Sequence, residues 1–283
     1  MGLGLGRLTA GQSWIDLKSR LVSAVVLGLA VLAVAIVGGL PFRILCFATA
    51  VIVFNEWSRM TRAKRAGPIY LFARRALFLG FFLFVFGFEF LALAVLFGAA
   101  GFIAFVDRNE RKAVWVGGGL LYASLAGIAP GMLRGNDPEG LASLGLVICV
   151  VWATDIFAYF AGRSIGGPKL MPLVSPKKTI SGALGGLVAG MVFGGLYSFV
   201  VSGNVTAYVL FVSAILSTLG QAGDLYESWI KRRFGVKDSG RLIPGHGGLM
   251  DRIDALIVAT AALWLIALLE RGFDEPARAI FRL

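Results

Sequence analysis

The sequence predicts an all-α fold, a polytopic bundle of about nine transmembrane helices. Hydrophobic residues make up 58% of the chain and charged residues only 15%. The mean hydropathy is +0.82, which excludes an ordinary soluble domain. Residues 21–42, 113–133 and 179–223 carry no charge at all. Because a helix needs about 20 apolar residues to cross a bilayer core of ~30 Å, the first two runs can each form one span and the third can form two.

The other spans follow from shorter apolar runs and from the charges between them. The runs on either side of Glu89, in "FGFEFLA", predict two short helices joined by a tight turn. Residues 140–162 contain a single charge, Asp155, and predict a further span. The turn "SGNVT" divides the long run 179–223. In chain order, the expected spans are 21–40, 42–55, 76–88, 90–106, 113–133, 143–163, 181–201, 204–222 and 254–270.

Lysine and arginine are concentrated in alternate loops. One side receives the start of the chain, "EWSRMTRAKR" with Arg74 and Arg75, "DRNERK", "GRSIGGPKLMPLVSPKK" and the segment 224–254. Because basic loops tend to stay in the cytoplasm, we expect a cytoplasmic N-terminus and an external C-terminus in a cell inner membrane. These loops account for the net charge of +11, so we expect no nucleic-acid partner.

We expect two regions along the chain. Residues 1–110 would form N-terminal transmembrane helices, and residues 111–283 a transmembrane catalytic region with cytoplasmic polar loops at 163–180 and 224–254. Between these loops, glycines recur at every fourth position from 182 to 194. Such a stripe of small residues lets membrane helices approach closely.

Carboxylates that could bind a metal lie in apolar surroundings or beside helix ends. They are Asp155, Asp224, Asp251 and Asp254. A carboxylate inside a membrane helix costs at least ~2.5 kcal/mol and needs a partner or a water-filled cavity. If the helix that reaches Asp224 continues, Glu227 and Ser228 share its face. Clustered carboxylates favour Mg²⁺, which bridges them to substrate phosphates; one histidine and two cysteines do not make a usual zinc site.

Basic and glycine-rich segments around these acids could bind phosphate. The segments "VSPKKT" and "KRR" supply cations, and the glycines of "GHGG" let backbone N–H groups approach an anion. His246, the only histidine, could be a general base, a phosphate donor or a loop-packing residue. The P-loop pattern is absent. The substrate-binding candidates are Arg163, Ser175, Lys177, Lys178, Ser228, Lys231, Arg232, Gly247, Gly248 and Arg252.

The segment "SWIKRRFGVKDSGRLIPGHGGLMDRID", residues 228–254, resembles the signature of the phosphatidate cytidylyltransferase family. The upstream segments "DIFAYFAGRSIGGPKLMPLVSPKKT" and "GDLYES" are similar to the same family. The similarity covers about 100 residues, from Asp155 to Asp254. One departure is Ser181, where many members carry a glutamate, so the role of that glutamate is open in this chain.

The resemblance implies that CTP and phosphatidic acid react to give CDP-diacylglycerol and pyrophosphate in phospholipid biosynthesis. It implies Mg²⁺ bound first by Asp224 and Asp251 and then by Asp254 and Asp155, and leaves open a second metal or a monovalent cation. It also implies a homodimer. The catalytic candidates are Asp224, Asp251, Lys237, Asp238 and His246.

Two other functions remain open from the residues. A CTP-dependent kinase of polyprenol or another lipid alcohol would need a base, which His246 or Asp238 could supply. A transporter would use an intramembrane acid such as Asp155 along an ion path. Its usual internal repeats are absent, and the polar residues gather at one membrane face.

Overall fold

The computed structural model describes residues 28–106, 111–242, 247–272 and 280–281 of the chain. Within these residues, eight helices are long and apolar enough to cross a membrane, which confirms an all-α transmembrane bundle. They are α2 (Gly39–Met60), α3 (Pro68–Val85), α4 (Glu89–Val106), α5 (Arg111–Arg134), α6 (Pro138–Ser164), α7 (Ile180–Ser202), α8 (Ala207–Arg233) and α9 (Met250–Arg271).

The first expected span, 21–40, is described only in part. A shorter apolar helix covers Gly28–Val37, and residues 21–27 lie outside the described part of the chain. Gly38 follows this helix with φ +68°, a backbone conformation that glycine adopts without steric cost. The chain continues directly into α2.

Two helices of the N-terminal half are longer than the sequence predicted. Helix α2 runs on to Met60 instead of ending near residue 55, and α3 begins at Pro68 instead of residue 76. The prediction treated the charges of this region as loop residues. Arg74 and Arg75 instead lie in the first two turns of α3 with exposed side chains, so they can stay near the helix end without burying their charge. A short 3₁₀ helix, η1 (Ala63–Ala66), connects α2 to α3.

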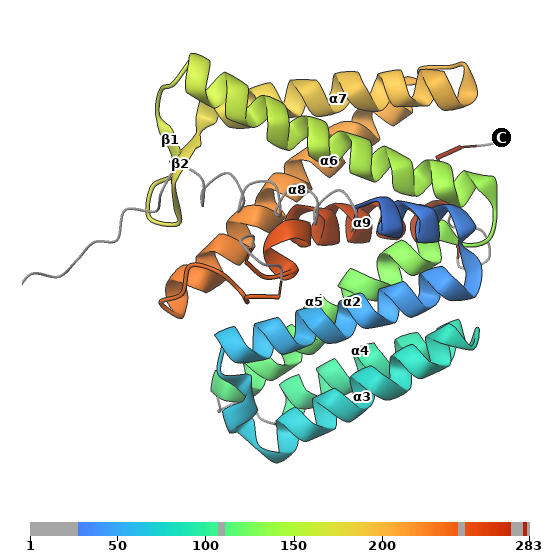
Figure 1. The fold of residues 1–283 in the computed structure, drawn as a ribbon, viewed down its shortest axis with the longest axis vertical. Helices are drawn as coiled ribbons and strands as arrows, with labels where there is room; N and C mark the ends of the chain where they lie inside the picture. Colours follow the sequence, from blue (N-terminus) through green and yellow to red (C-terminus); the bar gives the residue numbers. More distant parts are fainter. Residues whose placement is uncertain (1–27, 107–110, 243–246, 273–279, 282–283) are drawn as a thin grey trace, which may run out of the picture.

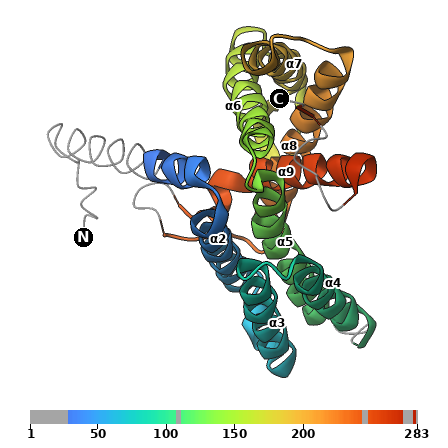
Figure 2. The ribbon, with the colours of Figure 1, turned by 90° about the vertical axis from the view of Figure 1, so that its right-hand side faces the viewer.

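The helices form two groups with α9 between them (Figures 1 and 2). One group contains α2, α3, α4 and α5, and the other contains α6, α7 and α8. Helix α9 packs against α8 on one side and against α5 and α2 on the other. Of the eight helices, α5 is the most enclosed, since 78% of an 18-residue stretch of it is buried. The core therefore centres on α5, and Trp57, Phe81 and Phe84 are among its fully buried aromatic side chains.

A β-hairpin interrupts the polar connection between α6 and α7. Strand β1 (Lys169–Met171) pairs antiparallel with β2 (Ser175–Thr179), and Met171 lies opposite Ser175. The sequence predicted only a polar loop here. Thr179 ends β2 and also caps α7, because its Oγ1 accepts a hydrogen bond from the Gly182 N–H at 3.1 Å. The hairpin lies at the same end of the bundle as the connection between α8 and α9 (Figure 1).

The predicted glycine stripe lies on the face of α7 that contacts α6 and α8. A Cβ atom at Gly182 would lie 2.8 Å from the Ala158 carbonyl oxygen, and one at Gly186 would lie 2.8 Å from the Thr154 carbonyl oxygen. Real Cβ atoms do not approach backbone oxygens this closely. The stripe therefore allows α6 and α7 to pack backbone to backbone, as small-residue stripes do in membranes.

Substitution of Gly186 by alanine should separate α6 from α7. Because the obstructing atom is a backbone oxygen, the helices must shift, and we expect a loss of about 1–3 kcal/mol. The measurement is the apparent Tm of the purified protein in detergent. Gly101→Ala in α4 is the matched control, since its Cβ would meet nothing within 4 Å. Equal melting of the two variants would contradict the packing role.

Candidate active site

A pocket of about 640 Å³ opens beside the hairpin, between the C-terminal part of α6, the start of α7 and the middle of α8. It brings together five of the charged residues that the sequence predicted as candidates. These are Asp155, Arg163, Lys177, Lys178 and Asp224. Lys169 of β1 also lines the cavity, so two carboxylates and four cations share it, although they come from four separate elements. Tyr159 and Gln221, which the sequence reasoning missed, also line it.

Asp224 is the acid at the centre of this pocket. Its Oδ2 forms an ion pair with Lys178 of β2, and its Oδ1 accepts a hydrogen bond from Ser228 Oγ at 3.4 Å. Both Asp224 and Lys178 keep about a third of their side chains exposed (30% and 32%). The ion pair is therefore accessible to an incoming ligand. A phosphate could replace Asp224 as the partner of Lys178, and a cation could replace Lys178 as the partner of Asp224.

Asp251, at the first turn of α9, is held more firmly than Asp224. Lys231 Nζ lies 2.8 Å from its Oδ1, and the backbone N–H groups of Ser239 and Gly248 donate to its Oδ2, both at 2.9 Å. Only 8% of the Asp251 side chain is exposed. Hydrogen bonds to an ionised acceptor are the stronger kind, so this carboxylate organises the glycine-rich segment around itself.

Helix α8 continues past Asp224 to Arg233, as the sequence analysis required for a shared face. Ser228 indeed lies within hydrogen-bonding distance of Asp224. Glu227, one residue before it, is fully buried, and its Oε1 lies 3.3 Å from Lys231 Nζ. Lys231 therefore pairs with both Glu227 and Asp251, and this links α8 to α9 through one partly buried cation.

The remaining candidates that the structure describes do not line this pocket. Arg232 donates through Nε to the Val174 carbonyl oxygen at 3.4 Å and so connects α8 to the hairpin. Lys237, Asp238 and Arg252 are exposed, and Ser175 is partly buried at the start of β2. Asp254 accepts a hydrogen bond from the N–H of Ala255 at 2.8 Å. His246 lies outside the described residues.

Ser181 occupies the position at which the sequence departs from the family pattern. Its Oγ donates a hydrogen bond to the Gly166 carbonyl oxygen. Gly166 and Gly167 lead into the hairpin with φ values of +67° and +101°, a region that favours glycine. In this chain, Ser181 therefore fastens the start of α7 to the turn that precedes the hairpin.

The sequence reasoning missed Glu56. It assigned this residue to a basic loop, whereas the structure places it inside α2 with only 3% of its surface exposed. Its carboxylate accepts hydrogen bonds from Ser239, Leu249 and Met250, more than 180 positions further along the chain. The only local signal was an acid between apolar residues, in "VFNEWS", and no spacing pattern links it to its partners.

The acids satisfy part of what a magnesium site needs. Within the described residues, no three acid, histidine or cysteine side chains gather closely enough to hold a metal by themselves. Mg²⁺ commonly takes only one or two carboxylates and completes its shell with water and substrate phosphates. Asp224 and Asp155 line the same pocket as Lys177 and Lys178. This donor set fits a cation that arrives with, or is completed by, a phosphate ligand.

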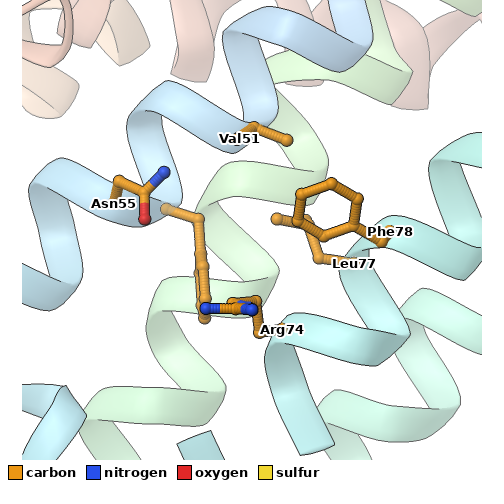
Figure 3. A pocket seen from close by; sticks show the side chains of 6 residues that line it. Val51, Asn55, Arg74, Leu77 and Phe78 are labelled. Atoms are coloured by element: carbon orange, nitrogen blue, oxygen red, sulfur yellow. The ribbon is translucent and has the colours of Figure 1, made fainter. Parts of the chain in front are cut away.

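A second, smaller pocket of about 280 Å³ lies between α2 and α3 (Figure 3). Asn55 and Arg74 supply its polar groups, while Val51, Leu77 and Phe78 supply apolar ones, as Figure 3 shows. None of the candidate catalytic residues lines it. The chemistry described above therefore belongs to the larger pocket beside the hairpin.

The fold and the site together define a multi-pass membrane protein with a charged, phosphate-compatible pocket at one end of its helix bundle. Residues 18–269 match the profile of the cytidylyltransferase family. The chain therefore belongs to the cytidylyltransferase family, and its activity class is that of a nucleotidyltransferase.

Similar proteins match along nearly their whole length. A phosphatidate cytidylyltransferase of Brucella suis is 37% identical over 266 residues, which cover 94% of this chain and 98% of the relative. A phosphatidate cytidylyltransferase of Bacillus subtilis is 33% identical over 269 residues, 89% of this chain and 98% of the relative. One from Staphylococcus aureus is 46% identical over a shorter stretch of 120 residues.

The two threonine caps allow a test of the hairpin's role. Thr179 caps α7 next to the pocket, and Thr206 caps α8 at the other end of α7 through a 3.2 Å hydrogen bond from the Val209 N–H. Alanine at either position should cost about 1 kcal/mol of stability. Only Thr179→Ala should also slow nucleotidyl transfer, because only Thr179 lines the pocket. Apparent Tm and transfer rate are measured for both, and an equal rate loss in Thr206→Ala would contradict the assignment.

Proposed function

We propose that this protein transfers the cytidylyl group of CTP to phosphatidic acid, giving CDP-diacylglycerol and pyrophosphate. The observation that carries the proposal is the pocket beside the hairpin, where Asp155 and Asp224 lie with Lys177 and Lys178. This arrangement suits a reaction between two phosphate compounds. The names of relatives that match at 33–37% identity over 98% of their own length support the choice of substrates.

The chemistry explains why cations dominate the pocket. A phosphate oxygen of phosphatidic acid attacks the α-phosphorus of CTP, a new P–O bond forms, and the bond from that phosphorus to the β-phosphate bridging oxygen breaks. The electron pair leaves with pyrophosphate. The nucleophile is already an anion, so no strong protein base is required. The main barrier is the approach of two anions, which positioned cations lower.

Lys177 and Lys178 would neutralise the phosphates in this reaction. Lys178 now pairs with Asp224, so a phosphate that binds Lys178 releases a carboxylate oxygen for another ligand. Asp224 and Asp251 would hold Mg²⁺, with Asp254 and Asp155 as further ligands. The bound metal supplies charge neutralisation of the triphosphate and of the leaving pyrophosphate. Lys231 keeps Asp251 in place through its 2.8 Å ion pair.

We further propose that the pocket faces the cytoplasm in a cell inner membrane. The hairpin and the connection from α8 to α9 lie at the same end of the bundle (Figure 1). Both segments are basic: Lys178 lies in β2, Arg233 ends α8 and Lys237 follows it. The positive-inside rule assigns such an end to the cytoplasm. CTP would enter from that side and phosphatidic acid from the adjacent leaflet. The homodimer implied by the family resemblance is part of the same proposal.

The first test is pyrophosphate release by the purified protein supplied with CTP, phosphatidic acid and Mg²⁺. We expect release to require all three. Asp224→Asn and Asp251→Asn should each lower the rate roughly 100-fold or more. Each removes a carboxylate that would hold the Mg²⁺, and the metal would stabilise the transferring phosphates. Glu89→Gln is the control, because Glu89 pairs with Arg43 at 2.5 Å at the N-terminus of α4, away from the pocket.

The products separate the competing functions. CDP in place of pyrophosphate would identify a lipid kinase and overturn cytidylyl transfer. Pyrophosphate release at a normal rate in one of the two aspartate variants would keep the reaction and remove that residue from the metal site. No turnover in a well-folded sample under any of these conditions would overturn the proposed function.

Lys178 should matter beyond its contribution to surface charge. Lys178→Ala removes a cation that lines the pocket, and we expect kcat/KM to fall roughly 10- to 100-fold, as for a lost charge-assisted hydrogen bond. Lys112→Ala is the matched control, because Lys112 is exposed and lies outside the pocket. Initial rates with each substrate varied in turn show which substrate Lys178 binds. Equal losses in the two variants would indicate a general charge effect instead.

A further inference from the structure

Glu56 is a buried carboxylate that connects the N-terminal helices to the glycine-rich segment. Its Oε1 accepts a hydrogen bond from the Leu249 N–H at 3.0 Å, and its Oε2 accepts one from the Met250 N–H at 2.8 Å. Ser239 Oγ donates a third bond to Oε2 at 3.2 Å. Within the described residues Glu56 takes part in no ion pair. Among the residues that the structure describes, the groups that stabilise its charge are these three hydrogen-bond donors.

These donors make Glu56 the cap of α9. Leu249 occupies the N-cap position of α9 but offers no side-chain hydrogen bond. The first N–H groups of a helix have no partner within the helix, and a carboxylate is the favoured partner because the helix N-terminus is electropositive. A side chain from α2 thus accepts from the N–H groups of Leu249 and Met250 at the start of α9. A serine or aspartate at position 249 would instead accept from N–H groups two or three residues further along.

Ser239 links Glu56 directly to the candidate metal ligand Asp251. The Ser239 hydroxyl donates to Glu56, while its backbone N–H donates to Asp251 at 2.9 Å. The first turn of α9, which Glu56 caps, also carries Asp251 itself. Asp251 is therefore connected to α2 both through Ser239 and through the first turn of α9. A change at Glu56 should shift Asp251 or weaken its hydrogen bond with Ser239.

Two glycines of the segment are required by the position of this carboxylate. A Cβ atom at Gly240 would lie 2.6 Å from Glu56 Oε1, and one at Gly248 would lie 2.7 Å from Oε2. Neither glycine has a positive φ, so the backbone itself would accept another residue. Space for the Glu56 side chain accounts for Gly240. At Gly248 a Cβ would also lie 2.1 Å from Ser239 Oγ, so this glycine leaves room for Glu56 together with its Ser239 partner.

We propose that Glu56 is a positioning residue for the active site: it caps α9 from α2 and so sets the place of Asp251. The inference rests on the proposed function where it treats Asp251 as a ligand of Mg²⁺. The anchoring of the segment by Glu56 is independent of that function. Glutamine at this position keeps the shape but replaces one acceptor oxygen by an NH₂ group, which cannot accept from Leu249 or Met250.

The test compares Glu56→Gln with Glu89→Gln in the full-length protein in detergent. Hydrogen exchange is measured first, on peptides that contain Leu249 and Met250. We expect exchange there to be about tenfold faster in Glu56→Gln, because bonds to a charged acceptor are lost. It should be unchanged in Glu89→Gln and in peptides from α4. Unchanged exchange at Leu249 and Met250 would overturn the anchoring role.

Kinetics then connect the anchor to the metal site. Pyrophosphate release is measured as a function of Mg²⁺ concentration at saturating substrates. For Glu56→Gln we expect the half-saturating Mg²⁺ concentration to rise about tenfold, as for loss of a residue that orients a metal ligand, with little change in KM for CTP. An unaltered Mg²⁺ dependence together with faster exchange would overturn the positioning role. If the wild type releases no pyrophosphate, the proposed function fails, while hydrogen exchange still decides the anchor.

A double-mutant cycle tests the contact without relying on one variant that folds poorly. Gly240→Ala should speed exchange at Leu249 in the wild-type background, because the new Cβ displaces the Glu56 carboxylate. Glu56→Asp shortens the side chain and makes room for that Cβ, so the same alanine should have a smaller effect there. Contacting residues show such coupling, whereas independent sites add. Additive effects would overturn the contact.

Discussion

The site depends on one physical constraint: a carboxylate buried at the end of an apolar helix bundle must be given donors or a cation. Glu56, Glu227 and Asp251 meet this constraint in different ways. Glu227 uses the Lys231 ammonium, Glu56 uses N–H groups and a hydroxyl, and Asp251 uses both kinds of partner. Because an unpaired buried charge is costly, these bonds decide the path of the chain from α8 to α9.

The pocket beside the hairpin depends on a second requirement, the close contact of α6 with α7. Glycines on α7 let the two backbones approach, and the hairpin then leaves α6 and returns to α7 over the end of α8. This path brings Lys178 to Asp224. The closely packed backbones of α6 and α7 therefore border the cavity on one side. The ion pair between Lys178 and Asp224 borders it on the other.

The two groups of helices contribute differently to the chemistry. The pocket itself is lined by α6, α7, α8 and the hairpin, all of which follow residue 137. The N-terminal group contributes Glu56, and helix α9 passes between the two groups (Figure 2). The start of α9, in the C-terminal half, is thus held by one carboxylate from the N-terminal half. This carboxylate accepts hydrogen bonds from Ser239, Leu249 and Met250, on both sides of the connection between α8 and α9.

The fold class, most of the helices and five of the charged residues of one pocket could be predicted from the sequence. Long uncharged runs require membrane helices, and the acids and lysines gathered near residues 155, 178 and 224 do line one pocket. The hairpin, the extension of α2 through "NEWS", and the contact of Glu56 with Leu249 and Met250 could not be predicted and depend on tertiary packing. The reason is physical: periodicity and charge report local preferences, whereas a carboxylate capping a helix more than 190 positions away depends on how two distant elements pack.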